Sequence, residues 1–319
     1  FDWVRPLSAA FRATGDEKYA ATFVDLMSDW MDKHPLETYP SPHPSYVGYG
    51  DFPWNAIQAG GRAQVLCQEF PTLIHAEGLS PEFLQRFLAC VYDHLVRMEA
   101  IEYHLDDNFI FIELTGFLTL LDRFPEFMDA PRLRMIIQER AVRRLDRQTT
   151  SEGTQTEWAA GYHVGVTQSA RKIGEMLESA GVTMPDSYWE RIRKMYEYTL
   201  SISTPNLWLP MFGDCSREEV EGTDPSVQEL YDVLQEATML FDDQKFTAVA
   251  ELREADLPSQ TCYGFKDSGT YVFRDSWKPD GIYFALHCSP PAGSHDQPDN
   301  GTFELCAYGR WLMTDSGYY

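Results

Sequence analysis

The sequence is poor in basic residues: 26 lysines and arginines stand against 49 aspartates and glutamates, for a formal net charge of −23. A protein that binds nucleic acid through its phosphates needs a patch or stripe of positive charge. Basic residues do cluster at 132–148, where their spacing suits a solvated helix face at least as well as a binding surface. The composition therefore argues against nucleic acid as a partner.

The sequence also lacks long hydrophobic runs and paired cysteines. No apolar run reaches the roughly 20 residues that cross a bilayer, so no membrane span is predicted and a soluble protein is expected. The six cysteines are scattered without a CxxC pair, which indicates neither a zinc ribbon nor a disulfide scaffold. Their redox state stays open.

The length and the ends of the chain set further bounds. With 319 residues and 44% hydrophobic content, the chain can build a large core, and two domains are the default expectation. The sequence opens at Phe1 as if inside a helix and stops at Tyr319, directly after a strand-like stretch. We therefore expect a fragment of a longer chain, cut at both ends.

The first three quarters of the chain have a helical period. From residue 16 to about 239, amphipathic stretches alternate with Pro, Gly and Asp or Asn breaks. Several stretches carry aromatic residues on both faces, as helices buried between neighbours do. This pattern predicts helical hairpins in a ring or solenoid. The expected helical segments are 15–34, 51–70, 80–100, 106–127, 130–148, 156–180 and 186–202.

After about residue 257 the period changes to two. The stretches 269–277, 281–289 and 302–317 alternate apolar with polar residues between Gly, Pro, Asp and Ser, which is typical of antiparallel strands. We predict a boundary near 250–260, with a helical domain at 1–255 whose N-terminal part is missing. Residues 256–319 then begin a truncated β-domain.

A dense polar cluster, "HDQPDNGTFEL" at 295–305, stands before the last predicted strands and is followed by "YGRWLMTDSG" at 308–317. This pair of motifs resembles the heparinase II/III-like polysaccharide lyases. The heparinase III type, polysaccharide lyase family 12, is the closest, because Gln297 stands where other relatives more often have a second histidine. The stretches 50–63, 106–127, 152–163 and 210–218 fit the same family in the same order.

The resemblance implies a fold, an activity and a location. The fold is of the α+β multidomain class: an incomplete (α/α) helical toroid followed by an antiparallel β-sandwich, of which only the beginning is present. The activity is β-elimination on a uronic-acid glycan, most of all heparan sulfate or a low-sulfated heparin-like glycosaminoglycan. An acidic polysaccharide is the expected partner, and the periplasm or the exterior of the cell the expected location.

The resemblance also assigns three catalytic residues. Asn108 would neutralise the C6 carboxylate of the sugar, Tyr162 would act as base and then acid, and His295 would serve the opposite epimer or help hold the carboxylate. Each has a plainer alternative. Asn108 precedes an apolar run and is a good helix N-cap, Tyr162 is one of 17 tyrosines at helical spacing, and an isolated loop histidine is usually solvated.

Four further residues are assigned to substrate binding. Trp54 would stack on a sugar, Asn55 and Arg62 would lie beside it in the cleft with Arg62 facing an acidic group, and His163 would support the neighbouring Tyr162. Ordinary helix packing with a surface arginine explains the first three equally well.

Gln297 and Asp315 match positions that hold a metal ion in the heparinase III type, and the family's third ligand would lie beyond Tyr319. A Gln carbonyl with a carboxylate suits calcium, and an added histidine would permit zinc. We expect one divalent metal, with a structural role in the loop that carries His295.

The strong negative charge conflicts with a densely sulfated substrate. A low-sulfated heparan region or another uronate polymer, such as hyaluronan, chondroitin or alginate, eases the conflict. A toroid-fold glycoside hydrolase with a carboxylate pair, such as Asp107 with Glu157, is an alternative enzyme. A glycan-binding protein without activity is a third possibility. The sequence does not indicate the oligomeric state.

Overall fold

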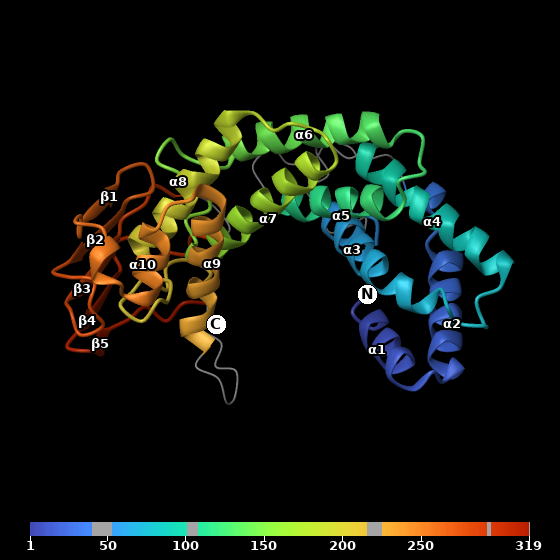
Figure 1. The fold of residues 1–319 in the computed structure, drawn as a ribbon, viewed down its shortest axis with the longest axis horizontal. Helices are drawn as coiled ribbons and strands as arrows, with labels where there is room; N and C mark the ends of the chain where they lie inside the picture. The colour runs from blue at the N-terminus through green and yellow to red at the C-terminus, as the bar shows by residue number, and fades with distance from the viewer. Residues whose placement is uncertain (40–52, 101–107, 216–224, 292–294, 319) are drawn as a thin grey trace. The chain divides into compact units, whose positions relative to one another are not determined.

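The computed structural model describes residues 1–39, 53–100, 108–215, 225–291 and 295–318 (Figure 1). These ranges contain ten α-helices and two short 3₁₀ helices, Leu36–Thr38 and Glu254–Asp256. The α-helices are α1 Val4–Thr14, α2 Glu17–Lys33, α3 Ala56–Leu73, α4 Pro81–Ala100, α5 Phe109–Arg123, α6 Ala130–Arg147, α7 Ala160–Ser179, α8 Asp186–Ile202, α9 Pro225–Phe241 and α10 Lys245–Glu251. Their order confirms the predicted helical majority of the chain.

The chain folds into two compact units. The first comprises residues 1–144 and 172–184, and the second comprises residues 145–171 and 185–319, so the boundary passes through α6 and α7. The predicted domain boundary at residue 255 follows the change from helices to strands and stays a prediction.

The helices of the first unit begin and pack as their sequences predict. The Asp16 side chain accepts a hydrogen bond from the backbone N–H of Lys18 and so caps the start of α2. Within α2, Phe23 and Met27 stand four residues apart and are fully buried, which places both on the face that packs against the rest of the unit.

The helices α3 and α5 cross at two glycines. A methyl group added at Gly60 would lie 2.7 Å from the Cα of Glu113, and one at Gly116 would lie 2.3 Å from the carbonyl oxygen of Gly60. Only residues without a side chain permit this backbone approach. Because α5 is apolar around most of its circumference, it becomes the buried centre of the unit.

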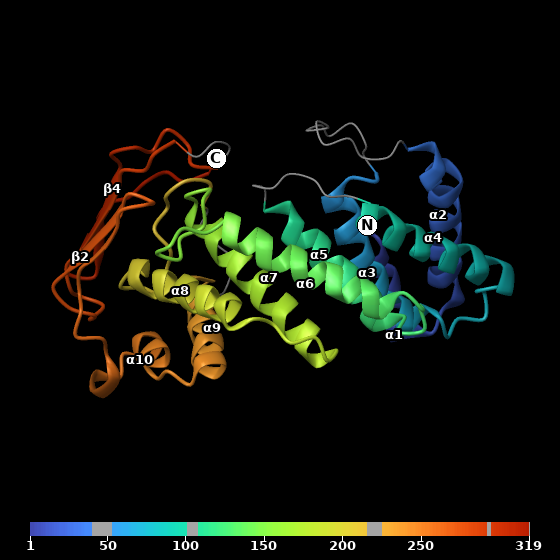
Figure 2. The same ribbon diagram turned by 90° about the horizontal axis from the view of Figure 1, so that it is seen from above.

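The second unit holds a five-stranded antiparallel sheet in the order β1-β2-β3-β4-β5, all of it within the predicted β region. Its strands are β1 Tyr263–Phe265, β2 Thr270–Arg274, β3 Tyr283–His287, β4 Phe303–Ala307 and β5 Arg310–Met313. Side chains alternate between the two faces: Val272, Ala285 and Glu304 pair across three strands and are buried, whereas Phe273 and Phe303 are exposed on the other face. Figure 2 shows α8, α9 and α10 on one side of this sheet.

The buried face of the sheet caps the end of α8. The last carbonyls of a helix have no partner inside it, and here the sheet supplies donors. Arg274 donates to the carbonyls of Ser201 and Ser203 at 2.6 and 3.2 Å, and the hydroxyl of Tyr283 donates to that of Ile202 at 2.8 Å. The guanidinium also lies over the ring of Trp277 at 3.9 Å.

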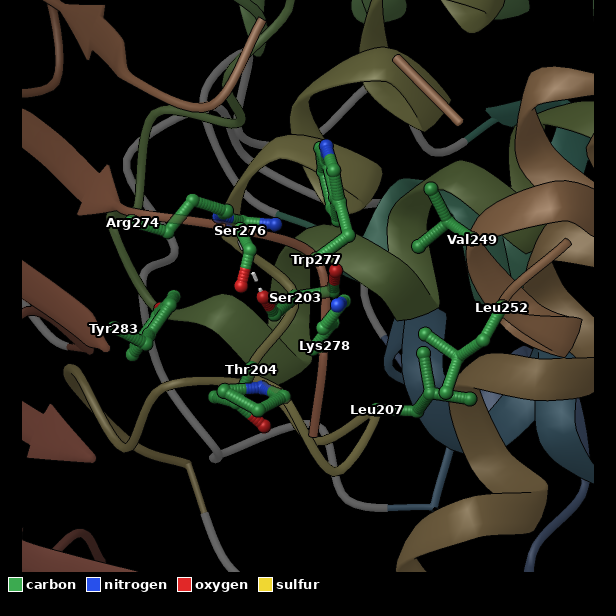
Figure 3. A pocket seen from close by; sticks show the side chains of 11 residues that line it. Ser203, Thr204, Leu207, Val249, Leu252, Arg274, Ser276, Trp277, Lys278 and Tyr283 are labelled. Carbon is green, nitrogen blue, oxygen red and sulfur yellow. Dashed lines mark hydrogen bonds between the residues drawn. The ribbon is translucent and has the colours of Figure 1, made fainter. Parts of the chain in front are cut away.

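A small pocket opens beside this junction (Figure 3). Arg274 and Tyr283 lie on one side of it, and Val249 and Leu252 lie on the other. Its cavity volume is about 10 Å³, which is room for about one water molecule. The pocket is therefore too small for a sugar and belongs to the packing of sheet against helices.

Candidate active site

Two of the predicted catalytic side chains are in contact within the second unit. The rings of Tyr162 and His295 are stacked, with centroids 3.9 Å apart and planes inclined by 23°. Tyr162 comes from the first turn of α7, and His295 comes from the segment between β3 and β4. The fold thus joins residues 133 positions apart in the chain, and both can take up and release protons.

Asp214 holds the histidine in place. Its Oδ2 lies 2.7 Å from Nδ1 of His295, and its Oδ1 accepts a hydrogen bond of 2.7 Å from Nε2 of Gln297. The side chains of Asp214 and His295 are 16% and 19% exposed, so the pair is sheltered and yet reaches the surface. The stretch 210–218 fits the family motif, but nothing in it reveals that this carboxylate pairs with a residue 81 positions later.

Backbone bonds also join the segment 211–215 to the segment 295–299. The N–H of Asp214 donates to the carbonyl of His295 at 2.9 Å, and the N–H of Gly213 donates to the carboxylate of Asp299 at 2.7 Å. Gly213 has a φ of +65°, and a methyl group there would lie 2.5 Å from the carbonyl oxygen of His295. A glycine is therefore required at this crossing.

Several carboxylates gather around this crossing. Burial raises the pKa of Asp299, and the hydrogen bond from Gly213 opposes the rise. The nearby carboxylates of Asp214, Asp296 and Asp315 raise this pKa further. Such a concentration of negative charge suits a cation better than an anionic glycan.

The predicted metal ligands offer oxygen atoms. The amide nitrogen of Gln297 donates to Asp214, which leaves its carbonyl oxygen available. The carboxylate of Asp315 accepts from Thr302 at 2.7 Å and from the N–H of Gly317 at 2.8 Å, and each oxygen retains a lone pair. These two donors fit a hard ion such as calcium. Among the described residues, no three His, Cys, Asp or Glu side chains gather to complete a site.

A buried histidine, His287, lies near Asp315 and was not predicted from the sequence. His287 is 1% exposed, stacks on Phe212 with centroids 5.1 Å apart, and exchanges backbone hydrogen bonds with the 301–302 turn opposite. Its ring nitrogens find no hydrogen-bond partner within the described ranges. Burial lowers its pKa to about 4, although the nearby carboxylates of Asp296 and Asp315 act to raise this pKa. A neutral imidazole therefore lies close to the predicted metal ligand.

Asn108 lies in the first unit, at the residue that precedes α5. Its backbone is already helical, with φ −64° and ψ −20°, and its side chain makes no capping hydrogen bond to α5. The alternative role as a side-chain N-cap is therefore wrong. The residue is 8% exposed. Its predicted contact with a sugar carboxylate stays a prediction.

Trp54 and Arg62 lie in the packed interior of the first unit, 1% and 4% exposed. Arg62 donates to the ring of His94 at 2.7 Å and to the carbonyl of Pro53 at 2.9 Å. Its guanidinium also lies over the rings of Trp30 and Trp54, at 4.3 and 4.8 Å. Both side chains therefore have packing partners within the unit, and their predicted contacts with a substrate stay a prediction.

The other two predicted substrate contacts also have structural partners. The side chain of Asn55 accepts from the N–H of Gln58 and caps α3. His163 is 1% exposed, with Nε2 2.9 Å from the carbonyl of Met195 and Nδ1 accepting from the N–H of Gln155. Burial lowers its pKa to about 4. His163 therefore joins the backbone at Gln155 and at Met195 as a neutral group, and its predicted support of Tyr162 stays a prediction. Asp107, half of the alternative carboxylate pair, lies outside the described residues.

Comparison with known families decides the classification. The family model "Heparinase II/III N-terminus" matches residues 1–244, and the model "Heparinase II/III-like, C-terminal" matches residues 260–319. The chain belongs to the heparinase II/III family. The resemblance inferred from residues 295–317 is thereby confirmed.

Curated relatives and solved structures agree with this membership. Proteins named heparin-sulfate lyase from Bacteroides stercoris and Pedobacter heparinus are each 28% identical over 99% of this chain. The chain covers 48% and 46% of those proteins, so it spans about half their length. A crystal structure of heparinase III matches with a TM-score of 0.81 at 25% identity, covering 99% of this chain and 49% of that one.

A second structural neighbour is the heparan sulfate lyase HepC from Pedobacter heparinus. It matches with a TM-score of 0.71 at 27% identity, over 99% of this chain and 48% of that chain. These likenesses confirm the predicted fold class, a helical toroid followed by an antiparallel β-domain. None of the helices in the described part of this heparinase II/III chain has both the length and the hydrophobicity to cross a bilayer.

Proposed function

We propose that the protein containing this chain is a polysaccharide lyase that cleaves heparan sulfate or a low-sulfated heparin-like glycosaminoglycan by β-elimination. The names of the curated relatives support this substrate class. The observation that carries the proposal is the contact of the Tyr162 and His295 rings, with His295 held by Asp214. That arrangement places two proton-transfer groups at one point on the protein.

Elimination on a uronate sugar sets three tasks. The C6 carboxylate must be neutralised so that the C5 proton becomes acidic, a base must take that proton, and an acid must protonate O4 as the C4–O4 bond breaks. The electrons of the C5–H bond form the C4–C5 double bond, and the pair of the C4–O4 bond leaves with oxygen. The product carries an unsaturated uronate end.

Tyr162 is the proposed base and acid on glucuronate. The C5 hydrogen and O4 of that sugar lie on one face, so a single phenol can take the proton and return it to O4. A phenol with the usual pKa of about 10 is a poor base at neutral pH and needs a cation or donor nearby. The imidazole of His295, stacked on the phenol ring, supplies that neighbour whenever it is protonated. His295 itself serves as base for the opposite epimer or helps hold the carboxylate.

Asn108 is the proposed partner of the C6 carboxylate. Its side-chain amide can donate hydrogen bonds to an anion.

Gln297 and Asp315 are proposed to hold one divalent metal, calcium or zinc, that supports the segment carrying His295. Such an ion would offset part of the negative charge at this crossing. Elemental analysis of the purified protein tests this directly. We expect stoichiometric metal in the wild type and its loss in Asp315→Asn, whereas metal-free wild-type protein in metal-replete buffer would contradict the site.

The low basic content supports a weakly sulfated substrate, because a chain of charge −23 repels dense anions at long range. Since glycans of this class lie outside the cytoplasm, we propose a periplasmic or secreted protein.

Ultraviolet absorbance tests the reaction, because elimination creates a conjugated uronate and hydrolysis does not. The full-length protein is incubated with heparan sulfate, heparin, hyaluronan, chondroitin and alginate, alongside Tyr162→Phe. Tyr92→Phe is the matched control, since Tyr92 is 47% exposed and lies on α4. We expect absorbance to rise on heparan sulfate and to be lost only in Tyr162→Phe.

Other outcomes decide against parts of the proposal. A rise on another polymer alone would replace the substrate and keep the reaction. New reducing ends without absorbance would favour a hydrolase, and binding without turnover would favour a glycan-binding protein.

A further inference from the structure

One carboxylate holds two side chains of the 295–299 segment at once. Asp214 meets His295 with one oxygen and Gln297 with the other, each at 2.7 Å. Both contacts are charge-assisted and short, which places them among the stronger hydrogen bonds of a protein. Asp214 therefore lies between the proposed base and a proposed metal ligand.

The contact with Asp214 decides which nitrogen of His295 can act. An ionised carboxylate only accepts hydrogen bonds, so Nδ1 must carry the proton. A neutral imidazole has one N–H, and its other nitrogen, Nε2, then presents a lone pair. We propose that Asp214 is a positioning residue that fixes His295 in this tautomer and ring orientation.

The same contact accounts for the conformation of Gln297. Its φ is +48°, in the left-handed region that is unfavourable for a residue with a side chain. The hydrogen bond from its amide to Asp214 offsets this cost and turns the carbonyl oxygen away from the carboxylate. Asp214 thereby sets the orientation of two groups at opposite sides of one turn.

The carboxylate of Asp214 is not the only group that holds the segments 211–215 and 295–299 together. The backbone bond from Asp214 to His295 and the bond from Gly213 to Asp299 join them independently. Removing the charge of Asp214 therefore leaves two other connections in place. This separates a positioning role from a structural one.

The consequence for turnover rests on the proposed lyase function, whereas the tautomer is measured without substrate. Asp214→Asn keeps the shape but replaces a pure acceptor by a group that can also donate to Nδ1. Asp299→Asn is the matched control, because Asp299 ties the same two segments together through the N–H of Gly213 and not through the ring of His295. Nitrogen NMR of the histidine rings in the full-length protein reports which nitrogen bears the proton.

In the wild type and in Asp299→Asn, we expect the proton of the neutral His295 ring to be on Nδ1. In Asp214→Asn, we expect a mixture of the Nδ1 and Nε2 tautomers. On the epimer that uses His295 as base, kcat of Asp214→Asn should fall by about 10² to 10⁴-fold with a much smaller change in KM. Asp214→Ala should behave like Asp214→Asn, with a similar melting temperature to Asp299→Asn.

An unchanged ring tautomer in Asp214→Asn and Asp214→Ala would overturn the inference. So would a kcat no lower than that of Asp299→Asn. If the wild type cleaves no uronate polymer, the proposed function fails, and the nitrogen shifts still decide whether Asp214 sets the state of His295.

Discussion

The phenol of Tyr162 and the imidazole of His295 lie face to face, 3.9 Å between centroids. A contact of this kind contributes about 0.5–1.5 kcal/mol beyond the area that it buries. The ring contact and the proton chemistry of His295 can be separated by substitution. His295→Phe keeps an aromatic ring and removes the nitrogens, whereas His295→Ala removes both.

We expect both variants to lose at least about 10²-fold in kcat on the epimer that uses His295 as base. Only His295→Ala should also lose the stacking energy, measured as the free energy of unfolding in urea. If His295→Phe keeps the wild-type kcat on every substrate, His295 acts only through its ring.

Adjacent glycines on α3 provide a matched test of the helix crossing. Gly60→Ala forces a methyl group to 2.7 Å from the backbone of Glu113, whereas Gly61→Ala meets nothing within 4 Å. We expect Gly60→Ala to lower the free energy of unfolding by about 2 kcal/mol or more, since helix backbones must separate. Gly61→Ala should raise it by up to about 1 kcal/mol through helix propensity. If Gly60→Ala and Gly61→Ala change the free energy of unfolding equally in thermal or urea unfolding, α3 and α5 do not cross as closely as described.

Arg274 should be essential for the junction of α8 with the sheet. Arg274→Met fills similar space but leaves the carbonyls of Ser201 and Ser203 without their donor, at a cost of about 2–4 kcal/mol. Tyr283→Phe removes one neutral hydrogen bond and should cost about 0.5–1.5 kcal/mol. Arg253→Met, on a side chain 40% exposed, is the control and should change stability by less than about 0.5 kcal/mol. If Arg274→Met lowers the free energy of unfolding by no more than Arg253→Met does, Arg274 does not have this role.

His163 should make stability depend on pH. Burial lowers its pKa to about 4 in the folded protein, whereas an unfolded chain takes up this proton near pH 6.5. The unfolded state therefore gains protons first as the pH falls, and stability drops between about pH 6.5 and 4 by up to roughly 3 kcal/mol. Above pH 6.5 the contribution is fully present.

The variant His163→Gln should flatten this slope in urea unfolding at several pH values. His287, whose pKa burial also lowers to about 4, keeps part of the slope in that variant. His75→Gln, at an exposed position, should leave the slope as it is. An unchanged slope in His163→Gln would show that His163 is not buried as a neutral group.

Periodicity predicted most of the fold because burial repeats along regular elements. The segments expected as helices contain α2 and α4 to α8, and they cover α3 except for its last three residues. The three expected β stretches contain β2 to β5. The strand β1 is three residues long and too short to show a period. The contact between Gly60 and Gly116 left no signal, because a sequence pattern does not say which helices approach each other.

The site was predicted in part for the same reason. Tyr162 and His295 were found through a family motif, and the fold joins them. Asp214 was missed because its partners lie 81 and 83 positions later. Trp54 and Arg62 carry chemistry suited to sugars, but the same aromatic and cationic groups stabilise one another in a core, and their burial could not be read from one sequence.

The hydrogen bonds between residues 211–215 and 295–299 have a consequence for protein engineering. Each segment supplies backbone and side-chain partners at fixed positions. The backbone of Gly213 also lies so close to the carbonyl oxygen of His295 that a residue with a side chain does not fit there. A one-residue insertion in either segment would shift every partner by one place. In chimeras built from members of this family, the two segments should therefore be exchanged together, as one cassette.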